Sequence, residues 1–209
     1  METVFRISRE KERINTMKKS FTFAGLFAAC FLFGQTVESG LLLHSSFDKF
    51  TTVPDYAANP QTVVSGIPQE LQMRMYKDPA NRHNAVMLNN KEFIGYTHQN
   101  NFNPQCGTIS FWVKPVNWKM SDNRYFQTFF EVRSGDCAYR LIINKVNAAG
   151  LVNVALMNNG KKYFARVRAD WKPGEWHKID LVWNSSSMKL YVDGVPPAPG
   201  TSGETVFKE

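Results

Sequence analysis

The chain has 209 residues, 43% of them hydrophobic and 13% aromatic, and a formal net charge of +7 at pH 7. This length supplies one domain with a two-sheet core and does not indicate two domains. Thirteen glycines and ten prolines suit many short strands with frequent turns better than a helical bundle. No Lys/Arg cluster reaches the density of a nucleic-acid-binding arm, so nucleic acid is excluded as the expected partner.

The segment Met17–Ser39 has the three parts of a secretory signal peptide: two lysines, an apolar run, and a polar tail that ends at Val37 and Ser39. The apolar run Phe21–Phe33 is short for a permanent membrane anchor. Cleavage is therefore expected between Ser39 and Gly40, which leaves a net charge of +5 and no membrane segment. The mature protein is expected to be secreted, periplasmic or on the cell surface.

The N-terminus leaves two alternatives open. Residues 1–16 are charged, so they either extend the signal peptide or lie ahead of the true start at Met17, and we favour the second interpretation. Lipidation of Cys30 is the less favoured alternative, because Phe27 is bulky ahead of Ala28-Ala29 and a second apolar stretch follows the cysteine.

The first third of the mature chain has weak patterns. A strand is expected at Gly40–Phe47. Residues 49–85 contain four prolines and little periodicity, which predicts loops with short strands around residues 63–64 and 71–76. Ala85–Leu88 is a further expected strand, and Phe93–Tyr96 is expected to pack a loop against the sheet.

Regular alternation begins at Gly107–Pro115, where Ile109, Phe111 and Val113 share the face that is expected to be buried. Two hairpins then follow, because turn-forming residues separate pairs of β-rich segments. The paired segments are Phe126–Val132 with Ala138–Lys145, around Ser134-Gly135-Asp136, and Leu151–Met157 with Lys162–Arg168, around Asn158-Asn159-Gly160. Helical periodicity never exceeds about ten residues in the mature chain, so helix is limited to a turn or two.

The clearest strand pair lies within Trp171–Gly194. In Glu175–Trp183 the alternate residues His177, Ile179, Leu181 and Trp183 share one face. A second strand, Lys189–Val192, ends at Asp193-Gly194, where glycine supplies the positive φ of a tight turn. The short polar loop between the two strands predicts an antiparallel hairpin.

The block WHKIDLVW followed by KLYVDG resembles the laminin-G-like, concanavalin-A-like jelly roll, and three further blocks occur in the same order as in that family: Leu41–Asp48, Gly107–Pro115 and Tyr139–Lys145. The resemblance implies an all-β fold, a two-sheet antiparallel β-sandwich. The expected organisation is a leader at residues 1–39, the jelly-roll domain at 40–195, and a Pro/Gly-rich tail or truncated domain end at 196–209. This fold carries lectins, adhesion modules, glycoside hydrolases and structural domains, so it does not select a function by itself.

Members of the resembled family continue after the Tyr-Val-Asp-Gly turn through further strands, commonly with an acidic Asp-Glu-Val-like motif that this sequence lacks. Either Thr205–Phe207 supplies a remnant strand, or the sequence is a C-terminally truncated fragment. A short sheet of that kind would expose unpaired backbone groups and favour association.

Catalytic patterns are not found in the mature sequence. A glycosidase on this fold needs two carboxylates side by side, whereas Glu70, Glu92, Glu131 and Glu175 are far apart and Asp180 has no acidic partner at strand spacing. The sequence also lacks a Gly-x-Ser-x-Gly elbow and His/Cys metal-ligand spacing. We therefore expect a protein that is not an enzyme, with His177 as a satisfied core or interfacial residue.

Sugar binding uses aromatic faces beside planar polar groups. The candidate ligand-binding residues are Trp112, Trp118, Tyr125, Tyr139 and Arg140, with Asn123 nearby. Trp171, Trp176 and Trp183 are interpreted as structural.

The sequence also offers a candidate disulfide and a candidate metal site. Cys106 and Cys137 form a candidate disulfide in an oxidising compartment, and two separate small core residues are the alternative. The resembled family often holds a structural calcium ion between its first strand and its C-terminal region, which by resemblance nominates Asp48 as a calcium ligand.

Together these observations predict a secreted, non-catalytic module that binds a carbohydrate or a protein, with a glycan or a cell-surface protein as its partner. The alternatives are a glycoside hydrolase-like domain acting on polysaccharide and a structural or adhesion fragment of a larger surface protein.

Overall fold

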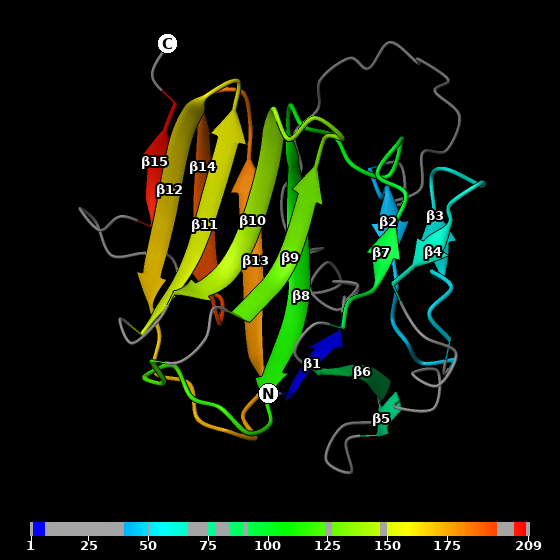
Figure 1. Ribbon diagram of the computed structural model, residues 1–209, viewed down its shortest axis with the longest axis vertical. Helices are drawn as coiled ribbons and strands as arrows, with labels where there is room; N and C mark the ends of the chain where they lie inside the picture. The colour runs from blue at the N-terminus through cyan, green and yellow to red at the C-terminus, as the bar shows by residue number, and fades with distance from the viewer. Residues whose placement is uncertain are drawn as a thin grey trace, which may run out of the picture.

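The computed structural model describes residues 2–6, 40–49, 51–66, 75–77, 84–89, 92–123, 127–146, 150–195 and 203–207. Within these ranges the chain forms strands, turns and loops and no helix. Two large antiparallel sheets stack face to face, and two small sheets lie to one side of them (Figure 1). The predicted all-β, two-sheet sandwich is therefore confirmed. Residues 7–39, with Cys30 and the signal-peptide core, and residues 67–74 and 196–202 lie outside the described ranges.

Each large sheet is continuous across neighbouring strands. The seven-stranded sheet has the order β15 (Glu204–Val206), β14 (Ser187–Val192), β13 (His177–Trp183), β8 (Gly107–Pro115), β1 (Glu2–Arg6), β6 (Asn84–Asn89) and β5 (Met75–Lys77). The four-stranded sheet has the order β12 (Lys161–Arg168), β11 (Leu151–Asn158), β10 (Tyr139–Val146) and β9 (Gln127–Arg133). The small sheets pair β2 (Leu43–His44) with β3 (Tyr56–Ala57) and β4 (Val64–Ser65) with β7 (Gly95–Tyr96).

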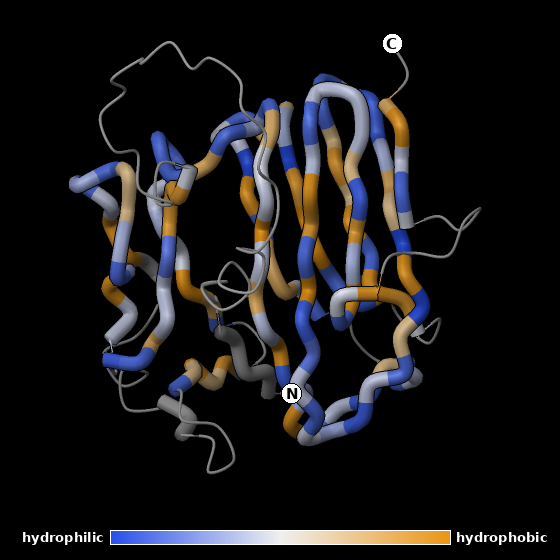
Figure 2. The backbone as a smooth tube through the Cα atoms, turned by 180° about the vertical axis from the view of Figure 1, so that it is seen from behind, coloured by the Kyte–Doolittle hydropathy of each residue, from blue (hydrophilic) through white to orange (hydrophobic). Residues whose placement is uncertain are grey.

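The main hydrophobic core lies between the two large sheets. The predicted alternation holds: Phe111 and Val113 of β8 and Ile179 and Leu181 of β13 are at most 3% exposed. The opposing sheet contributes Leu141, Ile143, Val152, Val154, Leu156 and Ala165. Figure 2 shows the resulting alternation of hydrophobic and hydrophilic residues along the strands. Each of the buried valine, leucine, isoleucine and phenylalanine side chains contributes about 1.5–3 kcal/mol to folding.

Turn chemistry fixes the hairpins where the sequence predicted them. Asn159 and Gly160 join β11 to β12 with φ of 47° and 81°, and Asp193 and Gly194 follow β14 with φ of 55° and 73°. Two successive residues of positive φ match the right-handed twist of the flanking strands. In the loop between β13 and β14, Asn184 Oδ1 accepts hydrogen bonds from the backbone N–H groups of Ser186 and Ser187.

One contact fixes the start of β8. Gly107 lies against the indole of Trp183, and a Cβ atom at Gly107 would be 2.7 Å from Trp183 Cζ2. The Trp183 ring in turn stacks on Phe102, with 5.4 Å between the ring centroids.

The N-terminal third differs from expectation. The predicted strand at residues 40–47 is reduced to β2, which pairs with β3 and not with a large sheet. Phe47 adopts a φ of 62°, so the chain turns away there, and its ring packs with Val86 and Leu88 in a second, smaller core. At the other end, the strand expected at Thr205–Phe207 occurs one residue earlier, as β15, and pairs with β14 through Ser187↔Val206 and Met188↔Thr205.

The predicted leader contributes a strand as well. Glu2–Arg6 forms β1 and lies in the seven-stranded sheet between β8 and β6. No helix among the described residues has the length and hydrophobicity to cross a membrane.

Candidate functional site

The outer side of the seven-stranded sheet collects aromatic and charged side chains from three adjacent strands. Because side chains alternate along β8, Ser110 and Trp112 lie on the side opposite the buried Phe111 and Val113. The register pairs Ser110 with Asp180 and Trp112 with Lys178 of β13, and Asp180 with Tyr191 of β14. We call these five residues, Ser110, Trp112, Lys178, Asp180 and Tyr191, the aromatic face.

Charge pairs surround the rings of the aromatic face. Lys178 Nζ lies 3.2 Å from Asp180 Oδ1, and both side chains are less than 20% exposed. Lys189 Nζ lies 3.3 Å from Glu204 Oε2 and 5.8 Å from the centroid of the Tyr191 ring. A cation at that distance is attracted by the π-electrons of the ring. The Lys178–Asp180 pair thus lies on the strand between those of Trp112 and Tyr191.

Lys114 and Trp176 extend this side of the sheet. Trp176, directly before β13, is half-buried, and Lys114 Nζ lies 5.0 Å from its ring centroid. Lys114 is only 6% exposed. Trp176 was predicted to be structural, but its ring lies on the same side of the sheet as Trp112, so it also borders the aromatic face.

A clamp between His177 and Asp193 holds β13 in place. Asp193 Oδ1 accepts the Lys178 backbone N–H at 2.8 Å, and Asp193 Oδ2 lies 2.9 Å from His177 Nδ1. The imidazole stacks on Trp171 at 4.5 Å between centroids. Burial alone would raise the pKa of the Asp193 carboxyl, but the hydrogen bonds from His177 and Lys178 outweigh it and hold that pKa below 3.8. The Trp-His strand and the Tyr-Val-Asp-Gly turn are therefore linked through one carboxylate.

Trp118 is not the exposed ring that the sequence suggested. It is 1% exposed and packs against Phe129 and Trp171, with ring centroids 6.0 and 6.4 Å away. The indole belongs to the main core, because Trp171 and Phe129 close over it from segments distant in the sequence. Trp118 therefore offers no ring face to a ligand in this structure.

The other candidate residues do not join Trp112. Tyr139 is half-buried and packs against Phe102 at 6.2 Å, and burial raises the pKa of its phenol. Arg140 lies on the outer side of the four-stranded sheet, away from the aromatic face. Tyr125 lies outside the described residues. Of the four predicted residues that the structure describes, only Trp112 lies in the aromatic face.

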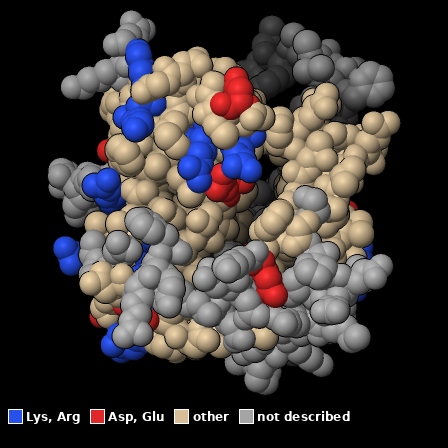
Figure 3. Space-filling model, in the orientation of Figure 1, with Lys and Arg blue, Asp and Glu red and all other residues tan. Residues whose placement is uncertain are grey.

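Arg140 forms a two-pronged ion pair with the neighbouring strand. Its Nε and Nη2 atoms each donate to one carboxylate oxygen of Glu131, both at 3.1 Å. Basic and acidic side chains lie next to one another on the side of the molecule that Figure 3 shows. The Glu131 carboxylate is thus engaged by an arginine.

The Arg140–Glu131 pair is expected to contribute little to stability. A double-mutant cycle with Arg140→Ala and Glu131→Ala should give a coupling energy of about 0.5–1 kcal/mol, because the pair is partly exposed and screened by salt. Urea unfolding of the four proteins, at low and at high ionic strength, measures this coupling. A coupling above about 2 kcal/mol that does not change with salt would contradict an exposed pair.

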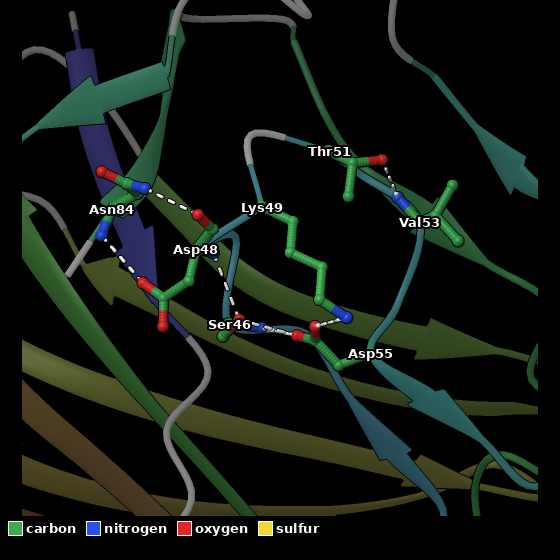
Figure 4. A network of polar contacts seen from close by, with 7 residues as sticks. All are labelled: Ser46, Asp48, Lys49, Thr51, Val53, Asp55 and Asn84. Carbon is green, nitrogen blue, oxygen red and sulfur yellow. Dashed lines mark hydrogen bonds and ion pairs between the residues drawn. The ribbon is translucent and has the colours of Figure 1, made fainter.

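The residues around Asp48 do not fit a calcium site. Asp48 Oδ1 accepts the Asn84 backbone N–H at 2.9 Å, and the Asp48 carbonyl accepts Asn84 Nδ2 at 2.8 Å (Figure 4). Asp55 instead accepts two hydrogen bonds from Ser46 and pairs with Lys49. Across the described ranges, no three His, Cys, Asp or Glu residues come together as a metal site. The Asp48 and Asp55 carboxylates accept hydrogen bonds from neighbouring loop residues, whereas a calcium ion requires six or more oxygen ligands that point to one centre.

Cys106 and Cys137 are both free in the structure. Cys106 directly precedes β8, Cys137 lies in the turn between β9 and β10, and both are exposed. The candidate disulfide between them is therefore not formed here, and neither residue is the buried core residue of the alternative interpretation.

Sequence reasoning missed Tyr191 and undervalued Trp176. The signal for Tyr191 was present, because it alternates with Leu190 and Val192 in a strand whose apolar partners must face the core. What the sequence lacked was the register of β14 on β13, which brings Tyr191 to the same side as Trp112.

The chain has similarity to solved structures and to one protein family. The solved structures that match include the carbohydrate binding module CBM66 from Bacillus subtilis, at 14% identity and a TM-score of 0.33 over 49% of this chain and 64% of that one. They also include the native heptameric SAP-like pentraxin from Limulus polyphemus, at 20% identity and a TM-score of 0.32 over 49% of this chain and 54% of that one. The chain thus spans less than two thirds of either structure.

No curated protein matches the chain significantly. A family model described as the concanavalin A-like lectin/glucanases superfamily matches residues 89–208, which is more than half of the chain. This range contains every strand of the main sandwich from β8 to β15. The chain belongs to the concanavalin A-like lectin/glucanases superfamily.

Proposed function

We propose that this protein is a secreted, non-catalytic carbohydrate-binding module, and that its sugar lies on the aromatic face. Membership of a lectin/glucanases superfamily supports a binding module in general terms. The observation that carries the proposal is the register that brings Trp112 and Tyr191 to one side of the sheet, with the Lys178–Asp180 pair beside them. Rings that stack on sugar C–H groups, next to fixed polar groups, are the usual elements of a sugar site.

The size of the aromatic face favours an oligosaccharide. Trp112 and Tyr191 are two strands apart and one two-residue step apart, so their Cα atoms are separated by about 12 Å. One sugar ring does not reach both aromatic rings, whereas a short chain of sugars does. The charge pair between them supplies both a donor and an acceptor for hydroxyl groups.

The superfamily name also includes glucanases, so a catalytic alternative is tested alongside binding. The carboxylate nearest to Trp112 in the register is Asp180, which pairs with Lys178. Glu131, on the opposite sheet, pairs with Arg140. These two acids lie on opposite sides of the sandwich and do not form the side-by-side pair that glycoside hydrolysis uses.

A glycan array with the full chain tests the proposal. Trp112→Ala and Tyr191→Ala should each weaken retention of the bound glycan about tenfold, since a lost aromatic contact costs about 1–1.5 kcal/mol. Phe164→Ala is the matched control, because Phe164 is 42% exposed on the outer side of the other large sheet. No retained glycan, or retention that neither substitution changes, would refute this site. Release of reducing ends from a polysaccharide panel would support the glucanase alternative instead.

A further inference from the structure

β1 is an interior strand of the seven-stranded sheet although it belongs to the predicted leader. It pairs on one side with β8, from Thr3↔Pro115 to Arg6↔Trp112, and on the other with β6, from Glu2↔Asn89 to Phe5↔Val86. The position of Phe5 lies between Val113 and Val86, which are 0% and 1% exposed. This position is therefore flanked by buried residues on both neighbouring strands.

The same strand joins the two hydrophobic cores. β8 belongs to the main core, whereas β6 supplies Val86 and Leu88 to the smaller core around Phe47. In the sheet order β1 stands between β8 and β6, and none of the described strand pairings joins those two directly. Without β1, the facing edges of β8 and β6 would lose their backbone partners.

Unpaired strand edges of this kind destabilise the fold and favour pairing with another strand. Each buried N–H or C=O group that loses its partner costs about 1–3 kcal/mol. An edge with a full row of unpaired groups is a template for another strand. Cleavage of the leader after Ser39, which the sequence predicts, would remove β1 and create two such edges facing one gap.

We propose that the gap between β8 and β6 is a strand-acceptor site with an exchangeable occupant. This inference rests on translation from Met1, the first of the two alternatives for the N-terminus, and on the predicted cleavage, and not on the sugar site. The resident occupant is Glu2–Arg6, and after cleavage the gap accepts an extended peptide with the pattern of that segment in its place, as in other cases of β-strand addition. The guest needs at least four residues without proline and an apolar residue at the position of Phe5, because that position lies between Val113 and Val86.

The test uses the full chain with a specific protease site inserted between Ser39 and Gly40. After the folded protein is cut, a fluorescent peptide of sequence METVFRISR is added, and its binding is followed by anisotropy and size-exclusion chromatography. The peptide should bind saturably, either by replacing the cut leader or by filling the gap that the leader has left. A peptide with Val4→Pro should bind at least tenfold more weakly, because proline removes one backbone N–H from the centre of the strand.

Each result decides the proposal. Saturable binding of the unmodified peptide with weak binding of the proline peptide supports it, as does aggregation after cutting that only the unmodified peptide prevents. Equal binding of both peptides, a cut leader that never exchanges with excess peptide, or a leader that leaves without any uptake of peptide overturns it. Uncut protein is the control and should bind neither peptide, because its gap is already occupied.

Discussion

Replacing Trp118 by alanine is expected to lower the free energy of unfolding by about 3–5 kcal/mol, the usual cost of truncating a fully buried tryptophan. Trp118 is 1% exposed, and its ring packs against those of Phe129 and Trp171. The loss is a large part of the 5–15 kcal/mol that typically separates native from unfolded protein. Urea denaturation followed by tryptophan fluorescence and circular dichroism measures it.

Trp112→Ala is the matched control for this experiment. The Trp112 ring is only half-buried on the aromatic face, so its removal should cost much less stability than removal of the Trp118 ring. The two substitutions should therefore separate stability from binding. A Trp118→Ala protein that is as stable as the wild type but has lost its glycan would show that Trp118 is a ligand-binding residue after all.

Asp193→Asn is expected to lower the free energy of unfolding at pH 7 by about 1–2 kcal/mol, because charged hydrogen bonds to His177 and to the Lys178 N–H are weakened. Asparagine also tolerates the φ of 55° at this position, so the backbone of the turn should persist. The side chain is 44% exposed, which keeps the effect below that of a buried pair.

The pH dependence of stability tests whether the charge of the Asp193 carboxylate causes the loss in Asp193→Asn. The pKa of Asp193 is depressed in the folded protein, so its contribution is complete above the unfolded pKa of 3.8 and is lost as the pH falls below that value. The stability gap between wild type and Asp193→Asn should therefore be present at pH 7 and should close as the pH falls below about 4. Asp170→Asn, at an exposed aspartate just after β12, is the control. A gap that persists unchanged at pH 3 would mean that the carboxylate charge is not responsible.

Local chemistry in the sequence was sufficient to predict the strands from β8 to β14. Asn159-Gly160 and Asp193-Gly194 specify tight turns by their backbone preferences alone, and the alternation around Ile179 and Leu181 specifies the buried side. These signals depend on neighbours within a few residues. The first third of the chain has no comparable signal, because it is rich in proline and asparagine. Long-range contacts therefore decide how the strands from β2 through β7 pair.

Lys145 shows where local pattern fails. Lysine in a strand usually indicates a solvent-facing side chain, yet Lys145 is 0% exposed and its Nζ donates to the Asp122 carbonyl at 2.6 Å. Burial lowers the pKa of this amine, and a single carbonyl that is 23 residues away in the sequence provides its partner. No spacing rule in the sequence reports such a contact.

The candidate site was only partly predictable for the same reason. Trp112 lies in an alternating strand, so its outward direction followed from Phe111 and Val113. Trp118 lies after Pro115 in a segment without periodicity, and only its contact with Trp171 decides that it is buried. Tyr191 joined the aromatic face through the pairing of β14 with β13, which is a property of the whole sheet.

The packing of Trp183 on Gly107 limits how this position can evolve. Even a methyl group there would press on the indole, whose nearest ring atoms would lie 2.7 and 2.8 Å away, and would disturb its stack on Phe102. The next residue, Thr108, is exposed and has no such neighbour to displace. Substitution is therefore expected to be tolerated at Thr108 and costly at Gly107, so two adjacent positions of one strand differ sharply in the side chains that they accept.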